Sequence, residues 1–128
     1  MLYFEDFEKH KIFNLGPKII SSREIIKFAK QWDPQYFHIN EELAKNSVYK
    51  KLIASGYHTC CFVMRMMVDE VLSKSSSLGS PGVNSIKWPN PVYSNSNIRV
   101  ALKVNNKRMS KSDNKRGVIE WETSAYDQ

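Results

Sequence analysis

The order of elements along this 128-residue chain predicts an α+β fold in which an antiparallel sheet wraps around one buried helix. Helical patterns fill the first half, and the strongest, at residues 57–72, is apolar on nearly all sides, which is typical of a buried helix. After residue 81 the pattern changes to extended segments rich in β-branched and aromatic residues, at 83–88, 98–104 and 118–125. The length favours a single domain over residues 1–128.

The first helix has clear signals at both ends. A turn is expected at Gly16-Pro17, after a short apolar stretch. Ser21 and Glu24 have the spacing of a capping box, which opens a helix. Pro34 ends it, because the residue before a proline is driven out of the α region.

A second, shorter helix and a polar hairpin are also predicted. Asn40 is typical of an N-cap, and the two glutamates after it suit the positive end of a helix that should reach about residue 51. Residues 105–117 are polar and basic, and we expect them to form the loop between the last two strands.

Composition excludes several classes of protein. Hydrophobic residues make up 41% and charged residues 25%, which excludes collagen-like, disulfide-scaffold and wholly disordered chains. The adjacent Cys60 and Cys61 are unsuited to a disulfide and indicate a reducing compartment. The amino terminus lacks the apolar stretch of a secretory signal, and the apolar stretch at residues 60–72 contains three charges. We therefore expect a cytoplasmic protein that does not span a membrane.

A carboxylate and an imidazole share one short loop. Asp33 and His38 lie five residues apart, and Pro34 stiffens the segment between them, so that the two side chains could flank one water and exchange protons with it. Gly56 opens the buried helix, whose free N–H groups could polarise a carbonyl. The structural alternatives are an Asp-Pro turn, a histidine that caps a backbone group, and a glycine needed for close packing.

Three stretches in register resemble one known family. Residues 28–40, 52–59 and 82–93 read FAKQWDPQYFHIN, LIASGYHT and GVNSIKWPNPVY. They are similar to the MaoC-like acyl dehydratases, the (R)-specific enoyl-CoA hydratase branch of the hotdog-fold proteins. The resemblance covers roughly residues 16–104, and we expect the sheet to lack a final strand, because the family pattern continues about one strand further.

The resemblance implies a hotdog fold with the helix from Gly56 at its centre, and a homodimer or higher homo-oligomer. It implies reversible hydration of trans-2-enoyl thioesters to 3-hydroxyacyl thioesters, with coenzyme A or an acyl carrier as part of the substrate and no other cofactor. Asp33 and His38 match the family's catalytic pair, and the Gly56 N–H matches the group that receives the thioester carbonyl.

The resemblance implies five further substrate-binding residues, four within these motifs and one eight residues beyond Gly56: Ser55, Tyr57, His58, Asn40 and Met64. Three of them depart from the family. Asn40 stands where many relatives have aspartate, Tyr57 where tryptophan is frequent, and Met64 where some hydratases have serine. His58 could face the site or pack against the sheet. The three histidines are scattered, and we expect no metal site.

Two other readings of the chain stay open. Residues 103–116 carry six basic side chains and one acid, which suits a solvated hairpin or an anchor for the phosphates of coenzyme A or an acidic carrier protein. Nucleic acid is disfavoured as a partner, because no aromatic residues lie between these cations.

Two alternative functions stay open for the chain as a whole: a non-catalytic acyl-CoA-binding hotdog module and a hotdog thioesterase.

Overall fold

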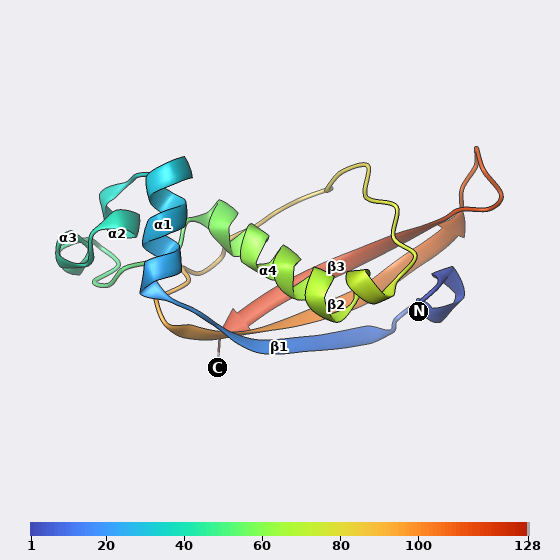
Figure 1. Cartoon of the computed structure of the whole chain (residues 1–128), viewed down its shortest axis with the longest axis horizontal. Helices are drawn as coiled ribbons and strands as arrows, with labels where there is room; N and C mark the ends of the chain where they lie inside the picture. The colour runs from blue at the N-terminus through green and yellow to red at the C-terminus, as the bar shows by residue number, and fades with distance from the viewer. Residues whose placement is uncertain (128) are drawn as a thin grey trace.

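The computed structural model describes residues 1–127. It has a three-stranded antiparallel sheet of order β1–β2–β3, with the long helix α4 across one face of the sheet (Figure 1). This arrangement confirms the predicted α+β fold. In chain order the elements are η1 (Phe4–Asp6), β1 (Ile12–Ile20), α1 (Ser22–Trp32), α2 (Tyr36–Ile39), α3 (Glu41–Lys45), α4 (Gly56–Glu70), η2 (Leu72–Lys74), β2 (Ser96–Met109) and β3 (Gly117–Asp127).

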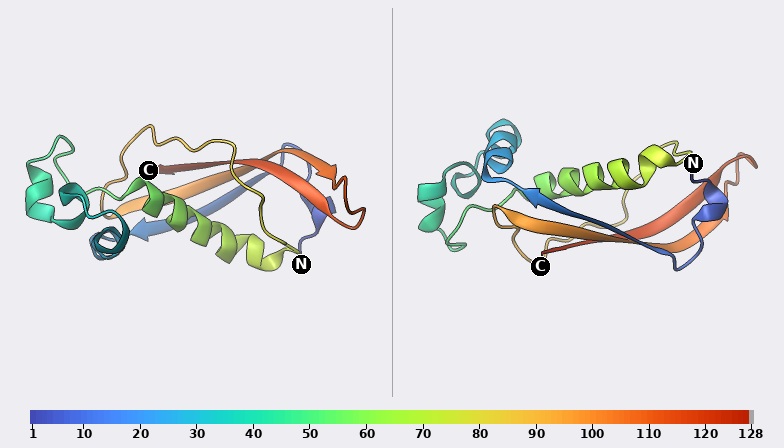
Figure 2. Two further views of the ribbon diagram at one scale, coloured as in Figure 1. Left: turned by 90° about the horizontal axis from the view of Figure 1, so that it is seen from above. Right: turned by 60° about the horizontal axis from the view of Figure 1, so that its bottom comes forward.

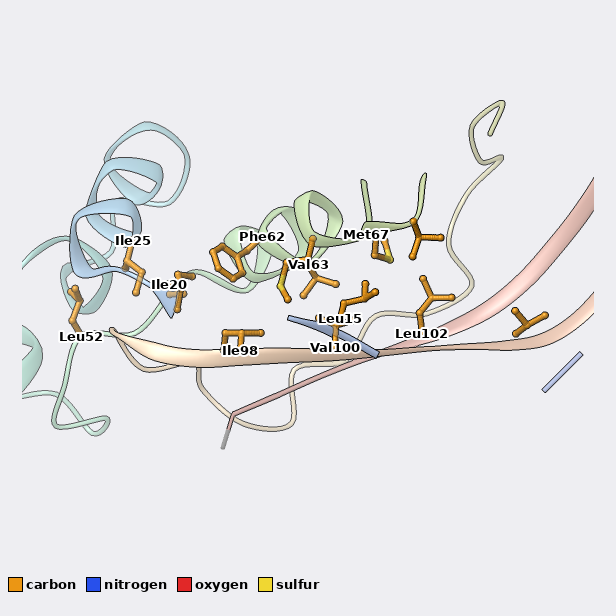
Figure 3. Packing of buried hydrophobic residues seen from close by; sticks show 14 of the residues in the cluster. Leu15, Ile20, Ile25, Leu52, Phe62, Val63, Met67, Ile98, Val100 and Leu102 are labelled. Carbon is orange, nitrogen blue, oxygen red and sulfur yellow. The ribbon is translucent and has the colours of Figure 1, made fainter. Parts of the chain in front are cut away.

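The core lies between the sheet and α4 (Figure 3). Alternate residues of the central strand β2 point to one face, as the two-residue period of a strand requires. Those on the covered face are almost fully buried: Ile98, Val100, Leu102 and Val104. They face the apolar side of α4, formed by Phe62, Val63, Met66 and Met67. Burial of these two stripes holds the helix in place, at roughly 25 cal/mol per Å² of apolar surface.

The predicted turn at Gly16-Pro17 is wrong, because both residues lie inside the nine-residue strand β1. The register between β1 and β2 shifts between Leu15 and Lys18, so the dipeptide forms a bulge rather than a reversal. Gly16 has φ +92° and donates its N–H to the carboxylate of Glu70, 3.0 Å away at the end of α4. The bulge therefore ties the edge strand to the helix that covers the sheet.

The central helix is buried on one side only, which corrects the expectation of a helix buried on all sides. Four residues at helical spacing, Tyr57, Cys61, Met64 and Val68, are exposed on the side away from the core. A three-stranded sheet covers one face of a helix, and the opposite face then needs another partner or solvent. We call these four residues the outer stripe of α4.

The expected strand at residues 83–88 is absent from the described structure. The segment is exposed and lies outside the three-stranded sheet. Its β-branched and aromatic residues favour extended backbone, but a strand also needs a neighbour about 4.8 Å away to complete its ladder. The segment 76–92 instead returns the chain from η2 to the beginning of α4 (Figure 2).

Two further boundaries differ from the prediction. The hairpin loop spans residues 110–116 rather than 105–117, because β2 and β3 pair as far as Met109 and Gly117. Helix α3 ends at Lys45 rather than near residue 51, and α2 occupies part of the segment expected to be a loop. Asn40 ends α2 and caps α3, so the two short helices share one residue.

Candidate active site

The candidate site is built from two segments that meet beside the start of α4. The first, residues 33–38, follows α1, whose capping box at Ser21 and Glu24 forms as predicted. The second, residues 53–56, leads into α4. The Ile53 N–H donates to the Phe37 carbonyl at 3.1 Å, and the Ala54 N–H donates to the Val92 carbonyl at 2.8 Å. These backbone bonds join segments that are distant in sequence.

His38 is held by the second segment. Its side chain is 5% exposed, and its Nδ1 lies 2.7 Å from the carbonyl oxygen of Ile53. A carbonyl oxygen can only accept, so Nδ1 carries a proton and donates it. This leaves Nε2 as the nitrogen available for proton exchange.

Asp33 meets that nitrogen. Its Oδ2 lies 3.3 Å from His38 Nε2, and its side chain is 27% exposed. Asp33 Oδ1 accepts a hydrogen bond of 2.8 Å from the Gln35 amide. One carboxylate oxygen is thus anchored by Gln35, and the other faces the imidazole. The structure brings together the two residues that the sequence suggested.

The surroundings of Asp33 favour its ionised form. Burial raises its pKa, but the hydrogen bond from Gln35, the nearby Ser55 hydroxyl and the attraction of His38 outweigh burial, so that the pKa lies below its ordinary value of 3.8. The pair is then an ionised carboxylate beside an imidazole, and the two can hold one proton between Oδ2 and Nε2. Such a pair can accept a proton from water and deliver one to carbon.

Gly56 is the first residue of α4, and its carbonyl accepts a hydrogen bond of 2.9 Å from Trp88 Nε1. A Cβ at Gly56 would lie 2.7 Å from Trp88 Cε2, so a glycine is needed for this close approach of the indole. Among residues 1–127, none accepts a backbone hydrogen bond from the Gly56 N–H. The N–H groups of a first helical turn carry partial positive charge and can bind a developing oxyanion.

Two of the five substrate-binding candidates flank Gly56. Ser55 is 1% exposed, and its hydroxyl has no hydrogen-bond partner among the described residues; it lies near Asp33 but outside hydrogen-bond geometry. His58 is 8% exposed and lies in the first turn of α4. Both polar groups are therefore buried beside the candidate site.

The other three candidates lie in different surroundings. Tyr57 is largely exposed and packs edge-on against Trp88, with ring centroids 5.4 Å apart. Met64 is half exposed on the outer stripe of α4, away from the core of this protomer. Asn40 uses its side-chain oxygen to cap α3, accepting from the Leu43 N–H at 2.9 Å. Their substrate-binding role stays a prediction.

Three contributors to the site were missed by reading the sequence. Gln35 lies inside the Asp-to-His segment, and its spacing from Asp33 is the signal that could have revealed it. The Ile53 carbonyl and the Trp88 indole come from distant parts of the chain. No spacing rule connects those two to His38 or Gly56.

The basic hairpin lies at the other end of the molecule. In Figure 1 the β2–β3 hairpin is at one end of the sheet, and α1 and α2 are at the opposite end. Some of its charge is already used: Arg116 pairs with Asp113 at 3.2 Å, and Lys107 Nζ donates to the Phe4 carbonyl at 2.8 Å. Within one protomer, the hairpin is thus not placed to anchor a substrate bound at Asp33.

The described residues show neither a membrane-spanning helix nor a cluster of metal ligands. Within residues 1–127, every helix is too short or too polar to cross a membrane. The described residues contain no group of three or more His, Cys, Asp or Glu side chains placed to hold a metal ion.

Comparison with known proteins decides the family. A family model described as "MaoC like domain" matches residues 9–125. The chain belongs to the MaoC-like family. The resemblance seen in the three sequence motifs is thus confirmed, and with it the hotdog fold.

Individual relatives agree with this assignment. The MaoC-like chain is 25% identical over 124 residues to "Uncharacterized protein YdeM" of Bacillus subtilis (strain 168), covering 97% of this chain and 86% of that protein. It is 29% identical to the crystal structure of the MaoC-like dehydratase from Rhodospirillum rubrum, with a TM-score of 0.81, covering 100% of this chain and 87% of that one. The (R)-hydratase from A. caviae, 15% identical over 94% of this chain and 86% of that chain, shares the fold with a TM-score of 0.71.

Proposed function

We propose that this MaoC-like protein catalyses reversible addition of water to trans-2-enoyl thioesters, forming 3-hydroxyacyl thioesters. The observation that carries the proposal is the contact between Asp33 and His38, 3.3 Å apart beside the first turn of α4. The relatives support the class of reaction, since they include a MaoC-like dehydratase and two (R)-hydratases. The pair supplies the groups that this reaction needs.

The proton balance of hydration suits a pair that holds one proton. The water oxygen forms a bond to Cβ of the enoyl group, and the pair takes the proton that this water loses. The pair also delivers one proton to Cα, so it returns to its starting state. With Nδ1 fixed on the Ile53 carbonyl, Nε2 of His38 and Oδ2 of Asp33 are the two atoms that exchange protons. General acid–base help of this kind accelerates reactions about 10²- to 10⁴-fold.

The start of α4 is suited to stabilise the negative charge that develops on the substrate during the reaction. As water adds to Cβ, negative charge gathers on the thioester carbonyl oxygen. The Gly56 N–H is the donor we assign to it, because it opens a 15-residue helix and has no acceptor among the described residues. A preorganised donor of this type contributes about 10²- to 10³-fold. No cofactor is required beyond the coenzyme A or carrier that bears the acyl group.

We propose a homodimer as the working unit, supported by the outer stripe of α4. Tyr57, Met64 and Val68 are 68%, 49% and 37% exposed, and Cys61 is also exposed between them. Their spacing of four, three and four residues makes one continuous apolar line along the helix. A second copy of the chain placed on this line would bury it and bring Met64 into the interface.

Steady-state hydration of crotonyl-CoA by Asp33→Asn and His38→Asn variants tests the proposed reaction. We expect kcat to fall about 10²- to 10⁴-fold in each variant, because the pair can no longer hold a transferable proton. Asparagine at position 38 can still donate to the Ile53 carbonyl, which limits damage to the buried segment. Loss of the conjugated enoyl thioester absorbance measures turnover.

Asp69→Asn is the matched control, because Asp69 pairs with Arg65 on the exposed side of α4. It should leave turnover unchanged. Wild-type turnover in both Asp33→Asn and His38→Asn would contradict the mechanism. Release of free thiol from an acyl-CoA would instead identify a thioesterase, and thermal stabilisation by acyl-CoA without turnover would identify a binding module.

A further inference from the structure

A second buried imidazole lies beside the candidate site and has no part in the proton transfers above. His58 follows Gly56 by two residues in the first turn of α4. It is 8% exposed, and its Nδ1 has no hydrogen-bond partner among residues 1–127. Buried polar atoms are nearly always paired, so this nitrogen calls for a partner that the described residues do not supply.

The ring of His58 is fixed by two aromatic neighbours. It stacks on Phe28 of α1 with ring centroids 4.6 Å apart and planes 10° apart, and it meets Phe62 edge-on at 6.4 Å. These contacts hold the imidazole in place. Its unpaired nitrogen is thus a fixed feature of the site rather than a side chain free to reach solvent.

Charge distinguishes what His58 can bind. Burial lowers the pKa of His58, the carboxylate of Glu24 opposes this, and His38 lowers it again. The influence of His38 also places His58 within electrostatic reach of that imidazole. The imidazole is therefore neutral near pH 7, and it offers one donor and one acceptor. A neutral ring suits an uncharged polar group better than an anion.

Ser55 is a second buried polar residue, on the other side of Gly56, and its hydroxyl lies near the Asp33 carboxylate. This hydroxyl helps to lower the pKa of Asp33 and is therefore occupied by the catalytic pair. Of the two buried side chains beside the N–H assigned to the thioester carbonyl, His58 is thus the one that has no polar partner among the described residues. A purely alkyl acyl chain would leave His58 unpaired, whereas a polar substituent would complete it.

We propose that His58 is a specificity-determining residue that hydrogen-bonds an uncharged polar substituent, such as a hydroxyl group, on the acyl chain of the thioester. This inference rests on the proposed hydration reaction and names its substrate class. A site built to bond a hydroxyl rejects the analogue that lacks it, because the site's own polar atom is then buried unpaired. The preferred substrates are accordingly hydroxylated enoyl thioesters rather than simple alkyl ones.

Two pairs of substrates matched in size test this preference. In each pair a terminal hydroxyl replaces a methyl group: 4-hydroxybut-2-enoyl-CoA against pent-2-enoyl-CoA, and 5-hydroxypent-2-enoyl-CoA against hex-2-enoyl-CoA. We expect the full-length wild type to favour the hydroxylated member of at least one pair by about 10²-fold in kcat/KM. His58→Phe keeps the stack on Phe28, and it should reduce that ratio at least about tenfold, because the loss falls on the hydroxylated member.

Two further variants sharpen the result. His58→Gln, which retains a polar side chain, should keep part of the preference, and His10→Asn, which removes an exposed imidazole, should keep all of it. Equal kcat/KM within both pairs for the wild type would overturn the inference while leaving the proposed reaction intact. An equal fall for both members in His58→Phe would also overturn it, since that is the signature of a structural role. Absence of hydration for all four thioesters would overturn the proposed reaction and this inference with it.

Discussion

Single residues determine how the candidate site handles protons. His38 is oriented by one hydrogen bond to the Ile53 carbonyl, and Asp33 is oriented by one from the Gln35 amide. The first bond fixes Nδ1 of the imidazole and the second fixes Oδ1 of the carboxylate, so that Nε2 and Oδ2 are left facing each other. The Gln35 bond also stabilises negative charge, and it is one of the reasons that the pKa of Asp33 lies below 3.8.

Gln35→Ala should therefore move the acid limb of activity. Asp33 stays ionised as the pH falls to about 4, because its pKa in the folded protein is lowered. Without the Gln35 donor this pKa rises, and kcat/KM should begin to fall at a higher pH than in the wild type, while kcat near pH 7 changes little. A pH–rate profile measures the shift.

The lowered pKa of Asp33 also makes the stability of the folded protein fall at acid pH. Since the pKa of Asp33 is lower in the folded than in the unfolded chain, its contribution to stability is present above about pH 4 and is lost as the pH falls through the folded-state pKa.

The control for the pH–rate profile is Gln31→Ala, an exposed change on α1, which should leave the acid limb in place. An acid limb at the same pH in Gln35→Ala and wild type would exclude this role of Gln35.

Among the elements, β1 and α4 are joined at one bulge. Gly16 has φ +92°, and a Cβ there would lie 2.7 Å from the Ile98 carbonyl oxygen and 2.8 Å from Cε of Met66. Both backbone conformation and space thus require glycine. The N–H of the same residue bonds the Glu70 carboxylate, so the bulge sets the position of the far end of α4.

Gly16→Ala should lower the free energy of unfolding by about 2–5 kcal/mol, which combines backbone strain with overpacking. Gly79→Ala is the matched control, because Gly79 has φ +110° but nothing within 4 Å of its added Cβ. The Gly79→Ala variant should lose only the contribution of backbone strain, about 1 kcal/mol of the free energy of unfolding. Urea denaturation of both variants separates the two contributions, and equal losses would contradict the steric account of Gly16.

In the molecule as a whole, the helix α4 covers one face of the sheet, and the side of α4 that faces away from the sheet is exposed. The outer stripe of α4 faces away from the core, and the segment 76–92 is extended without a strand partner in the described chain. Both features are apolar or strand-like in sequence. The exposure of the outer stripe is explained if a second copy covers α4, as proposed above.

Met64→Glu should therefore convert a dimer to a monomer, because it places a charge in the middle of the apolar stripe. Val48→Glu makes the same chemical change at a residue that is 86% exposed outside the outer stripe, and it should leave the assembly unchanged. Sedimentation velocity over a range of concentrations gives the mass of each. A monomeric wild type, or a dimeric Met64→Glu, would contradict this interface.

The predictable parts of the fold are those with local signals. The Ser21–Glu24 capping box, the Asn40 cap and the alternation along β2 depend on neighbours within a few residues, and all three form as expected. Residues 83–88 show the limit of such signals. Their composition favours extended backbone, but whether a strand forms depends on a partner that local composition does not specify.

The candidate site divides in the same way. The spacing of Asp33 and His38 on a stiff loop suggested a pair, with an Asp-Pro turn and a capping histidine as alternatives, and the motifs of the MaoC-like family pointed to the pair. The contributions of Ile53 and Trp88 could not be predicted, because each joins segments of the chain that fold together only through the sheet and α4. The spacing of residues in the sequence predicts local geometry, but it does not predict which distant carbonyl or indole will contact a given residue.

By itself, the sequence determined the α+β class of fold and the position of its long helix, because periodicity and caps are properties of adjacent residues, and the motifs of the MaoC-like family pointed to the acid–imidazole pair. Only the tertiary structure decided that the Gly16 bulge lies within a strand, that α4 keeps an exposed face, and that the basic hairpin lies far from Asp33 (Figure 1). It also left His58 buried beside the site with an unpaired nitrogen. Such features depend on which surfaces meet in three dimensions, and burial and charge act there between residues that are far apart in the chain.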